Sequence, residues 1–488
     1  MVKKKLKDHS LFDELELRGR WGLNEEELNV IGSLNYSQNK IELDLVGTLK
    51  PVDHSLIGAF TQDDSSFLTI YGIAESGERI SLLNCAKTNS TTRFNGISVE
   101  KYEVDDAIVG TEFINNNYKF KFITFSTNDL GIWSGINRIN NDHIMSQEND
   151  QVFSQTVDLA KIKQNLLEWP IEKFGTILKE NYMLNISGTE ERNQIYNYKF
   201  LFQYELTRDQ EMESLDWFVQ KIYSLKSLLT LLIGAPLFFD NINIYGDYLD
   251  KEQNGKQYRK KFKVLHRQHG SYNEMKLKRS KILLTLPEIK DFSSLISLWF
   301  EKENDLRVLV DFINGDHYNS MSAENVFLNI AQTAEIFHRR FSGEKLMTTE
   351  EKDDYLSKRT KLIEYLDLEF DKDFATLIKN RISNPDAFSL KDRLTSLISK
   401  LDLKTIRTFI GDTNEVKSFI KNIGDRRNYL THLDEERYKD KIKSSDIDLI
   451  LDTHRLKVIM IIHVLSVLNV QEVDSFNKLQ SIYSYLKK

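Results

Sequence analysis

Residues 458–470, VIMIIHVLSVLNV, carry apolar side chains at every position except His463, Ser466 and Asn469. A helix that is apolar on all sides is buried inside a larger helical assembly. The run is shorter than the roughly 18 to 20 residues that a membrane span needs. We therefore expect the central helix of a soluble bundle here, with the alternative that the same helix also supplies a dimer face.

The sequence around this run keeps a period of 3.6 residues from Asp291 onward, which is typical of packed amphipathic helices. The predicted helices lie near residues 291–314, 322–342, 351–364, 371–382, 389–399, 413–430, 444–469 and 474–486. We assign residues 291–488 to one α-helical domain built as a bundle.

The N-terminal part has a different period. Short runs with two-residue alternation, rich in Ile, Leu, Thr, Tyr and Phe, are separated by Asn, Gly, Asp and Ser, as expected for antiparallel strands. Examples are residues 29–34, 41–46, 67–73, 79–84 and 118–125. Residues 1–150 are therefore predicted to form a β-rich N-terminal domain.

Residues 151–290 are predicted to form a second β-rich module with one helix. Strand-like runs are found at residues 172–184, 195–205, 242–247 and 281–286. An amphipathic stripe over residues 211–232 predicts the helix, which Gly234 and Pro236 would stop. The fold class expected for the whole chain is α+β, with a β-rich region followed by an all-α bundle.

Composition excludes several classes of protein. The chain has 488 residues, one cysteine and a formal net charge of -7, so it is neither a disulfide scaffold nor a globally basic nucleic-acid binder. It carries no apolar signal segment after its N-terminal lysines, so we expect a cytoplasmic protein without membrane contact. The Walker, G-x-G-x-x-G, G-x-S-x-G and H-E-x-x-H patterns are missing, and we expect no cofactor and no metal site.

The densest group of reactive side chains is in residues 416–432, VKSFIKNIGDRRNYLTH, where Arg427, Asn428 and His432 form R-N-x-x-x-H. A neutral imidazole can take a proton from a ribose 2'-hydroxyl or return one to a leaving oxygen. A guanidinium stays charged and can hold a pentavalent phosphorane. These residue types are sufficient for metal-independent RNA cleavage.

The spacing of this motif presents a geometric problem. Positions five apart on a straight helix differ by about 140 degrees, so Arg427 and His432 would not share one face. Either the helix ends near Tyr429, or a second copy of the motif across a two-fold axis completes the site. Simpler readings are that Arg426 or Arg427 pairs with Asp425 or Glu435, and that His432 is a cation at a helix C-terminus.

The motif resembles the catalytic motif of HEPN domains, and the rest of the chain is similar to the ApeA-like HEPN family. The helical half carries this likeness in LWFE (298–301), FLNIAQTAEIFHR (327–339) and LKDRL (390–394). The β-rich half carries it in GRWGL (19–23), GSL (32–34), LTIYGIA (68–74) and ISLLNC (80–85). The resemblance implies an anti-phage defence protein with a β-rich sensor or regulator region and a C-terminal HEPN ribonuclease, in which Arg427 stabilises the transition state, His432 is the general acid or base, and Asn428 is the polar residue after the arginine.

Further candidate residues lie in two other segments. Glu335 and Arg339 are candidates to support the catalytic cleft, as is Arg426, although an i, i+4 ion pair explains Glu335 and Arg339 equally well. The basic run 256–281 is either an RNA-binding surface or a solvated hairpin. Its RNA-binding candidates are Arg259, Lys260, Lys261, Lys263 and Arg267.

Two functions from different classes follow. The first is an endoribonuclease toxin of the abortive-infection type that cleaves RNA, such as tRNA or mRNA, when the N-terminal β region senses a phage-derived trigger. This protein would be a homodimer through its HEPN domain. The alternative is a non-catalytic sensor module that binds RNA or protein.

Overall fold

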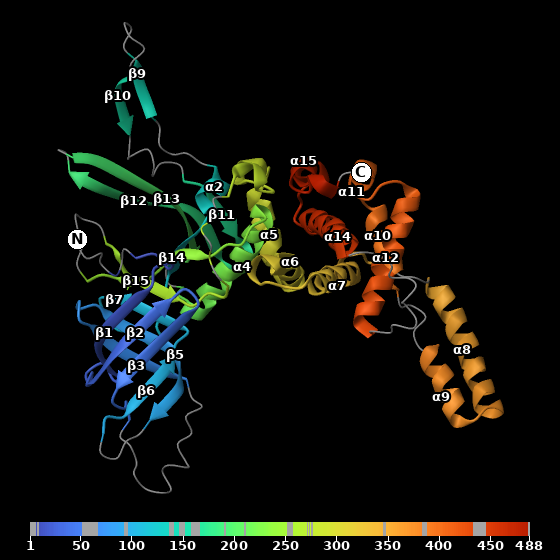
Figure 1. The fold of residues 1–488 in the computed structure, drawn as a ribbon, viewed down its shortest axis with the longest axis horizontal. Coiled ribbons are helices and arrows are strands. Elements are labelled where there is room, and N and C mark those ends of the chain that lie inside the picture. The colour runs from blue at the N-terminus through green and yellow to red at the C-terminus, as the bar shows by residue number, and fades with distance from the viewer. Residues whose placement is uncertain are drawn as a thin grey trace. The chain divides into compact units, whose positions relative to one another are not determined.

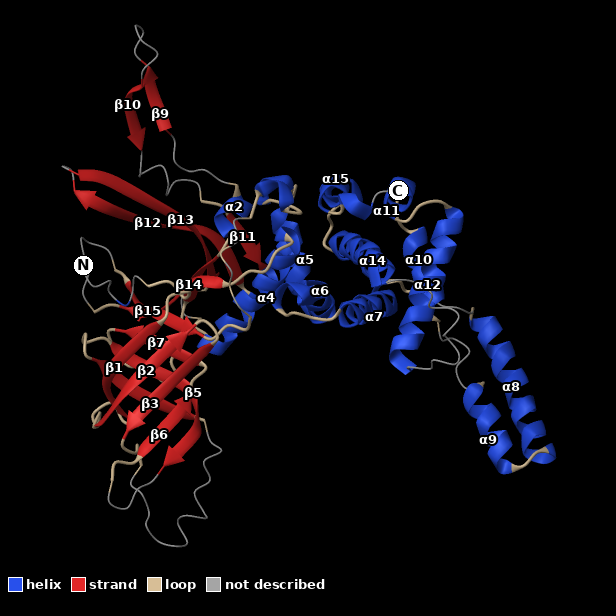
Figure 2. Ribbon diagram, viewed as in Figure 1, coloured by secondary structure: helices blue, strands red, loops and turns tan. Residues whose placement is uncertain are grey.

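The structure is a computed structural model, and it describes most of the chain (Figures 1 and 2). The described residues are 6, 9–50, 67–91, 96–135, 141–145, 152–157, 166–189, 192–208, 211–250, 257–270, 272, 274, 277–344, 348–382, 388–432 and 446–486. The chain forms two compact units that divide near Glu303. The β-rich unit comprises Met1–Glu303 with the short segments His317–Asn319 and Leu468–Val470, and the helical unit comprises the remainder. The expected α+β class, with a β-rich region before a helical region, is confirmed.

A 13-stranded antiparallel sheet forms the β-rich unit, in the order β11-β12-β13-β8-β14-β15-β7-β5-β4-β1-β2-β3-β6. The first eight strands are β1 (Leu15–Gly22), β2 (Val30–Ser37), β3 (Lys40–Val46), β4 (Leu68–Ala74), β5 (Arg79–Thr91), β6 (Val99–Glu103), β7 (Asp106–Gly110) and β8 (Phe122–Thr127). The others are β11 (Glu168–Ile171), β12 (Thr176–Thr189), β13 (Arg192–Leu206), β14 (Phe239–Tyr248) and β15 (Arg259–His266). A separate hairpin pairs β9 (Asn141–Met145) with β10 (Val152–Val157).

Strands from the two predicted modules, 1–150 and 151–290, alternate within this one sheet. β8 pairs with β13 on one side and β14 on the other, and β7 pairs with β15. The backbone hydrogen bonds between these strands therefore join residues before position 150 to residues after it, and the two predicted modules share one sheet.

Part of the sheet closes on itself. β5 also pairs with β6, so β5, β4, β1, β2, β3 and β6 form a closed barrel of six strands. Closure removes the free strand edges that invite aggregation. Alternating residues of these strands point inward and are fully buried, among them Leu34, Leu43 and Ile70.

The GRWGL and LTIYGIA motifs meet inside this barrel. Trp21 on β1 lies directly opposite Gly72 on β4 and is fully buried. A Cβ on Gly72 would lie 2.2 Å from the indole ring, and a Cβ on Gly32 would lie 3.2 Å from it. At position 72 only glycine leaves space for the tryptophan ring. Both motifs are therefore explained by packing of the barrel interior, without a bound ligand.

Helix α4 (Leu215–Ile233) confirms the helix predicted over residues 211–232. The Ser214 side chain accepts a hydrogen bond from the N–H of Trp217 at its start, and Gly234 ends it with φ of 75 degrees. The short elements of this unit are α2 (Leu130–Ser134), η2 (Glu172–Phe174), η3 (Arg279–Lys281) and η4 (Leu286–Glu288).

The strand predicted at residues 281–286 is wrong. That run lies between η3 and η4, where Thr285 and Glu288 form a capping box. Its apolar residues Ile282, Leu283 and Leu284 are buried, so burial without strand pairing explains the hydrophobic pattern. Conversely, β15 is a sheet strand within the basic run that sequence interpretation gave only as an RNA surface or a hairpin.

Most helices after Asp291 follow the predicted pattern, but the single helix predicted over residues 291–314 is two helices divided at Lys302, and α11 is an additional short one. The helices are α5 (Phe292–Glu301), α6 (Glu303–Tyr318), α7 (Ala323–Phe341), α8 (Thr349–Glu369), α9 (Lys372–Arg381), α10 (Leu390–Ser399), α11 (Leu403–Phe409), α12 (Thr413–His432), α14 (Asp446–Val467) and α15 (Glu472–Ile482), followed by η5 (Ser484–Leu486). None of the described helices combines the length and the apolar character that crossing a membrane requires.

The central apolar run forms the C-terminal part of α14, whose residues from Leu456 to Leu465 are all buried. α14 packs along α7. His463 lies in this contact, where its Nε2 donates to the carbonyl of Leu397 at 3.1 Å and its ring packs on Phe337. The interior of the helical unit therefore holds a hydrogen-bonded, neutral histidine.

Lowering the pH is expected to destabilise the helical unit through His463. Burial lowers the pKa of this ring to about 4, whereas a histidine in an unfolded chain titrates near about 6.5. Between these values the unfolded state binds a proton and the folded state does not, so the free energy of unfolding falls as the pH drops. The full effect is about 3 kcal/mol at most. Urea unfolding followed by helical circular dichroism, at neutral and at mildly acidic pH, measures it.

His463→Gln is the matched variant, because an amide can still donate to Leu397 and does not titrate. The pH dependence should become shallower without disappearing, since burial also lowers the pKa of His338 and of His454. Parallel curves for the variant and the wild type would contradict this assignment.

Candidate active site

Helix α12 presents the R-N-x-x-x-H motif. The Asp412 carboxylate accepts from the N–H groups of Asn414 and Glu415, and the Glu415 carboxylate accepts from the N–H of Asp412, which caps the helix start. The helix then continues through His432. The idea that it ends near Tyr429 and so turns His432 toward Arg427 is therefore wrong.

Arg426 points into the interior of the helical unit. Its Nη1 lies 3.0 Å from Oδ2 of Asp452 on α14, and Nη1 of Arg455 lies 2.9 Å from the other oxygen of the same carboxylate. Burial raises the pKa of Asp452, while the two guanidiniums act in the opposite direction. Arg426 thus anchors α12 to α14, which is a structural role, because removing one partner of a buried ion pair leaves an uncompensated charge.

Arg427 takes a different direction from the same helix. Its Nε lies 3.0 Å from Oε1 of Glu335 on α7, and its Nη2 donates to Oε2 at 3.3 Å, so the pair is bidentate. Nη1 also approaches the Asn428 side-chain oxygen at 3.5 Å. The guanidinium remains one-third exposed. Arg427, Glu335 and Asn428 therefore form one cluster that is open to solvent.

His432 is the last residue of α12 and is exposed. It lies five positions after Arg427 on a continuous helix, which corresponds to a rotation of about 140 degrees and a rise of about 7.5 Å. One copy of the chain consequently presents the two motif side chains on different faces of α12.

Arg339 does not pair with Glu335, one turn earlier on its own helix. Glu335 bonds Arg427 instead, and Arg339 is exposed. The simpler pairing of Arg426 or Arg427 with Asp425 is not observed, because Asp425 binds Lys391 at 2.8 Å. The other expected partner, Glu435, lies outside the described residues.

Sequence reasoning missed a third arginine at this cluster. A capping box between Ser389 and Asp392 starts α10 and places Arg393 in its first turn. Nη1 of Arg393 donates to Nδ1 of His338 on α7 at 3.3 Å. The charges of Arg339 and Glu335 both act on the Arg393 guanidinium. The segment LKDRL (390–394), which contains Arg393, supported the family likeness. By itself it indicated no role for this arginine.

The five RNA-binding candidates on and after β15 are engaged within the β-rich unit. Lys260 pairs with Glu112 at 2.7 Å, and Lys263 is buried with its Nζ donating to the His9 carbonyl. The guanidinium of Arg259 lies 4.0 Å from the ring centre of Tyr248, the Lys261 ammonium lies 6.0 Å from that of Tyr245, and Arg267 binds Glu103 and Asp105. An RNA-binding role for this segment stays a prediction from the sequence alone.

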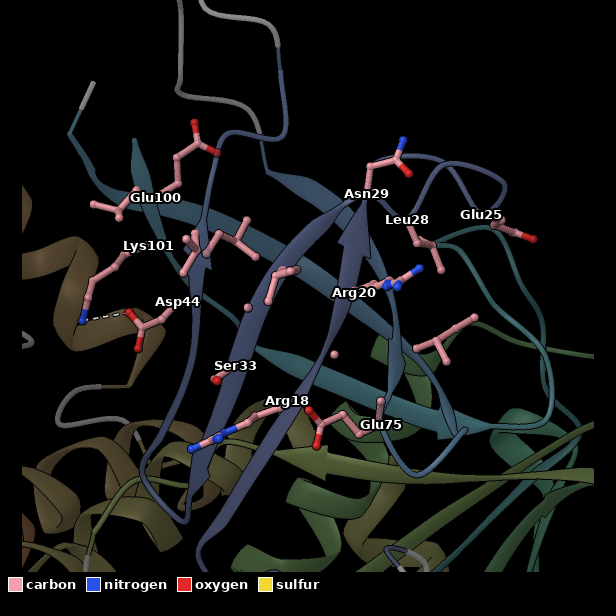
Figure 3. A pocket seen from close by; sticks show the side chains of 18 of the residues that line it. Arg18, Arg20, Glu25, Leu28, Asn29, Ser33, Asp44, Glu75, Glu100 and Lys101 are labelled. Atoms are coloured by element: carbon pink, nitrogen blue, oxygen red, sulfur yellow. Dashed lines mark ion pairs between the residues drawn. The ribbon is translucent and has the colours of Figure 1, made fainter. Parts of the chain in front are cut away.

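A groove of about 1250 Å³ runs over the outer face of the barrel in the β-rich unit (Figure 3). Its floor is a cross-strand row that passes over β4, β1, β2, β3 and β6. The row consists of Ile73, Arg20, Ile31, Val46 and Val99. Ile31 is 65% exposed and Val46 is 53% exposed. Glu25, Glu26, Asp44, Glu75 and Glu100 outnumber the basic lining residues Arg18, Arg20 and Lys101, so the surface is unsuited to nucleic acid.

Among the described residues, no three His, Cys, Asp or Glu side chains gather closely enough to hold a metal ion. The side chains available for chemistry are instead the Arg427 guanidinium, which the Glu335 carboxylate holds, and the exposed His432 imidazole on another face of α12. Such a set can bind phosphate and transfer protons.

Two protein-family models match the chain. The model of ApeA N-terminal domain 1 matches residues 16–299, more than half of the chain, and the Apea-like HEPN model matches residues 328–474. Searches of curated proteins and of solved structures gave no match. The fold and these two matches thus define a chain with a β-rich N-terminal domain that is followed in sequence by a HEPN helical bundle. This chain belongs to the ApeA family, and its HEPN domain is of the defence-associated, nuclease-related kind.

Proposed function

We propose that this chain is a metal-independent endoribonuclease that acts as a toxin in abortive infection. The observation that supports the proposal is the placement of R-N-x-x-x-H in an Apea-like HEPN domain. There, Arg427 is held by two hydrogen bonds and is partly exposed, and His432 is exposed at the end of the same helix.

In the proposed reaction a ribose 2'-oxygen attacks the adjacent phosphorus, and the bond from phosphorus to the 5'-oxygen breaks. The products carry a 2',3'-cyclic phosphate and a 5'-hydroxyl. The His432 imidazole removes the 2'-proton or supplies one to the leaving oxygen. The Arg427 guanidinium stabilises the negative charge on the phosphorane, and Glu335 and Asn428 orient it.

The rotation between Arg427 and His432 supports a homodimer through the HEPN domain. A two-fold axis brings the same surface of a second copy against the first, so the arginine of one copy can meet the histidine of the other. Tyr429, on the same helix, is a candidate contact, and Leu433, the other candidate, lies outside the described residues.

The defence role is supported by the match to ApeA N-terminal domain 1. The β-rich unit would sense a phage-derived trigger, and the acidic, apolar-floored groove on its barrel would suit a protein better than a nucleic acid. The substrate would be host or phage RNA, tRNA and mRNA being the first candidates, encountered in the cytoplasm.

His432→Ala should lower RNA cleavage by about 100- to 10,000-fold, the usual contribution of a general acid or base. Purified protein is incubated with total bacterial RNA in EDTA, and fragment ends are mapped. We expect discrete cuts with cyclic or 3'-phosphate ends from the wild type. His9→Ala, which removes a histidine of the β-rich unit that lies outside the basic run, should cut normally. RNA binding without any cleavage by the wild type would favour the alternative of a non-catalytic sensor module.

A mixed dimer of Arg427→Ala and His432→Ala tests the shared site. If the two residues act across the interface, one of the two sites in the mixed dimer keeps both groups, and about half of the wild-type activity returns. The two variants are co-expressed with different tags, purified through both tags and assayed for RNA cleavage. Mixed dimers as inactive as either parent would show that the two residues act within one chain.

Cells that express the wild-type chain should form fewer plaques than cells with His432→Ala when challenged with a panel of phages. Cleavage arrests the infected cell before phage release, so protection depends on the catalytic histidine. Plating efficiency and RNA integrity after infection are the measurements, with His9→Ala as the control. Equal plating on all strains, with cleavage retained by the purified protein, would point to an RNA-turnover enzyme instead.

A further inference from the structure

The surface of helix α7 from Glu335 to Arg339 receives two arginines from two other helices. Glu335 binds Arg427 of α12, and His338 binds Arg393 of α10. Positions three apart on a helix lie on one face, about 5 to 6 Å apart at Cβ. The helices α7, α10 and α12 pack against one another, so both guanidiniums reach one region of the helical unit.

The two arginines differ in how their charge is compensated. Arg427 has a carboxylate as a bidentate partner, whereas the hydrogen bond of Arg393 within the described residues goes to an imidazole. Arg393 is half-buried, and burial together with the charge of Arg339 lowers its pKa.

The charges of Glu335 and Asp392 act in the opposite direction, and the Arg393 guanidinium lies 5.6 Å from the ring centre of Phe388, but no carboxylate of the described residues is in direct contact with it. A half-buried cation without such a contact is costly. An incoming anion would therefore stabilise the cation at Arg393.

The imidazole of His338 is held in the state that Arg393 requires. A guanidinium only donates, so Nδ1 of His338 must be the acceptor and Nε2 carries the proton. Nε2 then donates to Oε2 of Glu344 at 3.3 Å. Glu344 is kept ionised, with a pKa of about 2, because Lys400 lies 2.7 Å away and Ser396 donates to it at 2.8 Å.

Arg339 adds a third positive charge to those of Arg427 and Arg393. It is exposed, and it follows His338 directly on α7. The next residue, Arg340, is engaged elsewhere, with its Nη1 donating to the Asp305 carbonyl at 2.6 Å. The charge of Arg339 acts on the Arg393 guanidinium, which places these two basic side chains near each other, whereas Arg340 is held by Asp305.

We propose that Arg393 and Arg339 form a second phosphate-binding subsite, which holds the backbone phosphate next to the one that is cleaved. His338 is the positioning residue that orients Arg393. The inference rests on the proposed RNA cleavage, because it names the part of the substrate that these side chains bind. The subsite contacts only the phosphate backbone, so it contributes affinity independent of base sequence.

The test measures RNA binding as a function of salt, in the full-length chain with His432→Ala to prevent cleavage. The probe is a set of short single-stranded RNAs of different sequence. Adding Arg393→Gln should weaken binding by the same factor for every sequence. It should also make the slope of log affinity against log salt shallower by about 0.7, the value for one lost phosphate contact on a single strand.

Arg340→Gln is the matched control. It removes the same charge from the end of α7 and should leave the salt slope unchanged. Arg339→Gln, at an exposed position, gives a second route to the answer if Arg393→Gln does not fold. His338→Asn keeps an oxygen acceptor near the Nδ1 position and should retain the slope, whereas His338→Leu should lose it.

Equal slopes for the Arg393, Arg339 and Arg340 variants would overturn the subsite. The proposed function is judged separately by RNA cleavage with the otherwise wild-type chain. A shallower slope in a chain that never cleaves RNA would support the subsite and contradict the nuclease. Cleavage by the wild type together with equal slopes for all variants would support the nuclease and contradict the subsite.

Discussion

The buried pairing of Arg426 with Asp452 is the interaction on which the helical unit depends. A guanidinium in an apolar interior needs an anion, and α14 supplies one that Arg455 shares. This pairing fixes the rotation of α12 about its own axis. Because neighbouring residues on a helix point about 100 degrees apart, the next side chain, Arg427, is then directed to Glu335 on α7. The position of the motif arginine is thus a consequence of a structural ion pair one residue earlier.

Helix α7 connects the interior to the surface cluster. One of its faces packs on the apolar α14, and the residues Glu335, His338 and Arg339 face the helices that carry Arg427 and Arg393. The same helix carries core residues and residues of the Arg427 cluster. A substitution in the core next to α7 can therefore alter the position of that cluster. The β-rich unit solves a different problem: its barrel interior is filled by Trp21 against Gly72, and its outer groove is lined mainly by acids and aliphatic side chains. This division is the basis of the proposal that the β-rich unit recognises a trigger and the helical unit cleaves RNA.

Much of the fold could be predicted from periodicity. The two-residue and 3.6-residue periods located the β-rich and helical parts, Gly234 marked the end of α4, and the change of period at Asp291 marked the start of α5. The errors have a physical cause. Residues 281–286 were predicted as a strand because their apolar pattern indicates burial. Residues 282–286 are buried, but they pair with no strand. The basic strand β15 was missed as a strand because partners such as Glu112 come from distant segments and make a charged run compatible with a sheet.

The sequence by itself determined the identities that matter for chemistry: an arginine, an asparagine and a histidine in R-N-x-x-x-H. Only the tertiary structure decided which arginine is structural and which is exposed, since Arg426 and Arg427 are equivalent in a one-dimensional pattern. It also brought in Arg393 and His338, which are separated by 55 positions. Local periodicity reports which face of a helix is buried, whereas the partner of a charged side chain depends on helices that meet only after the chain has folded.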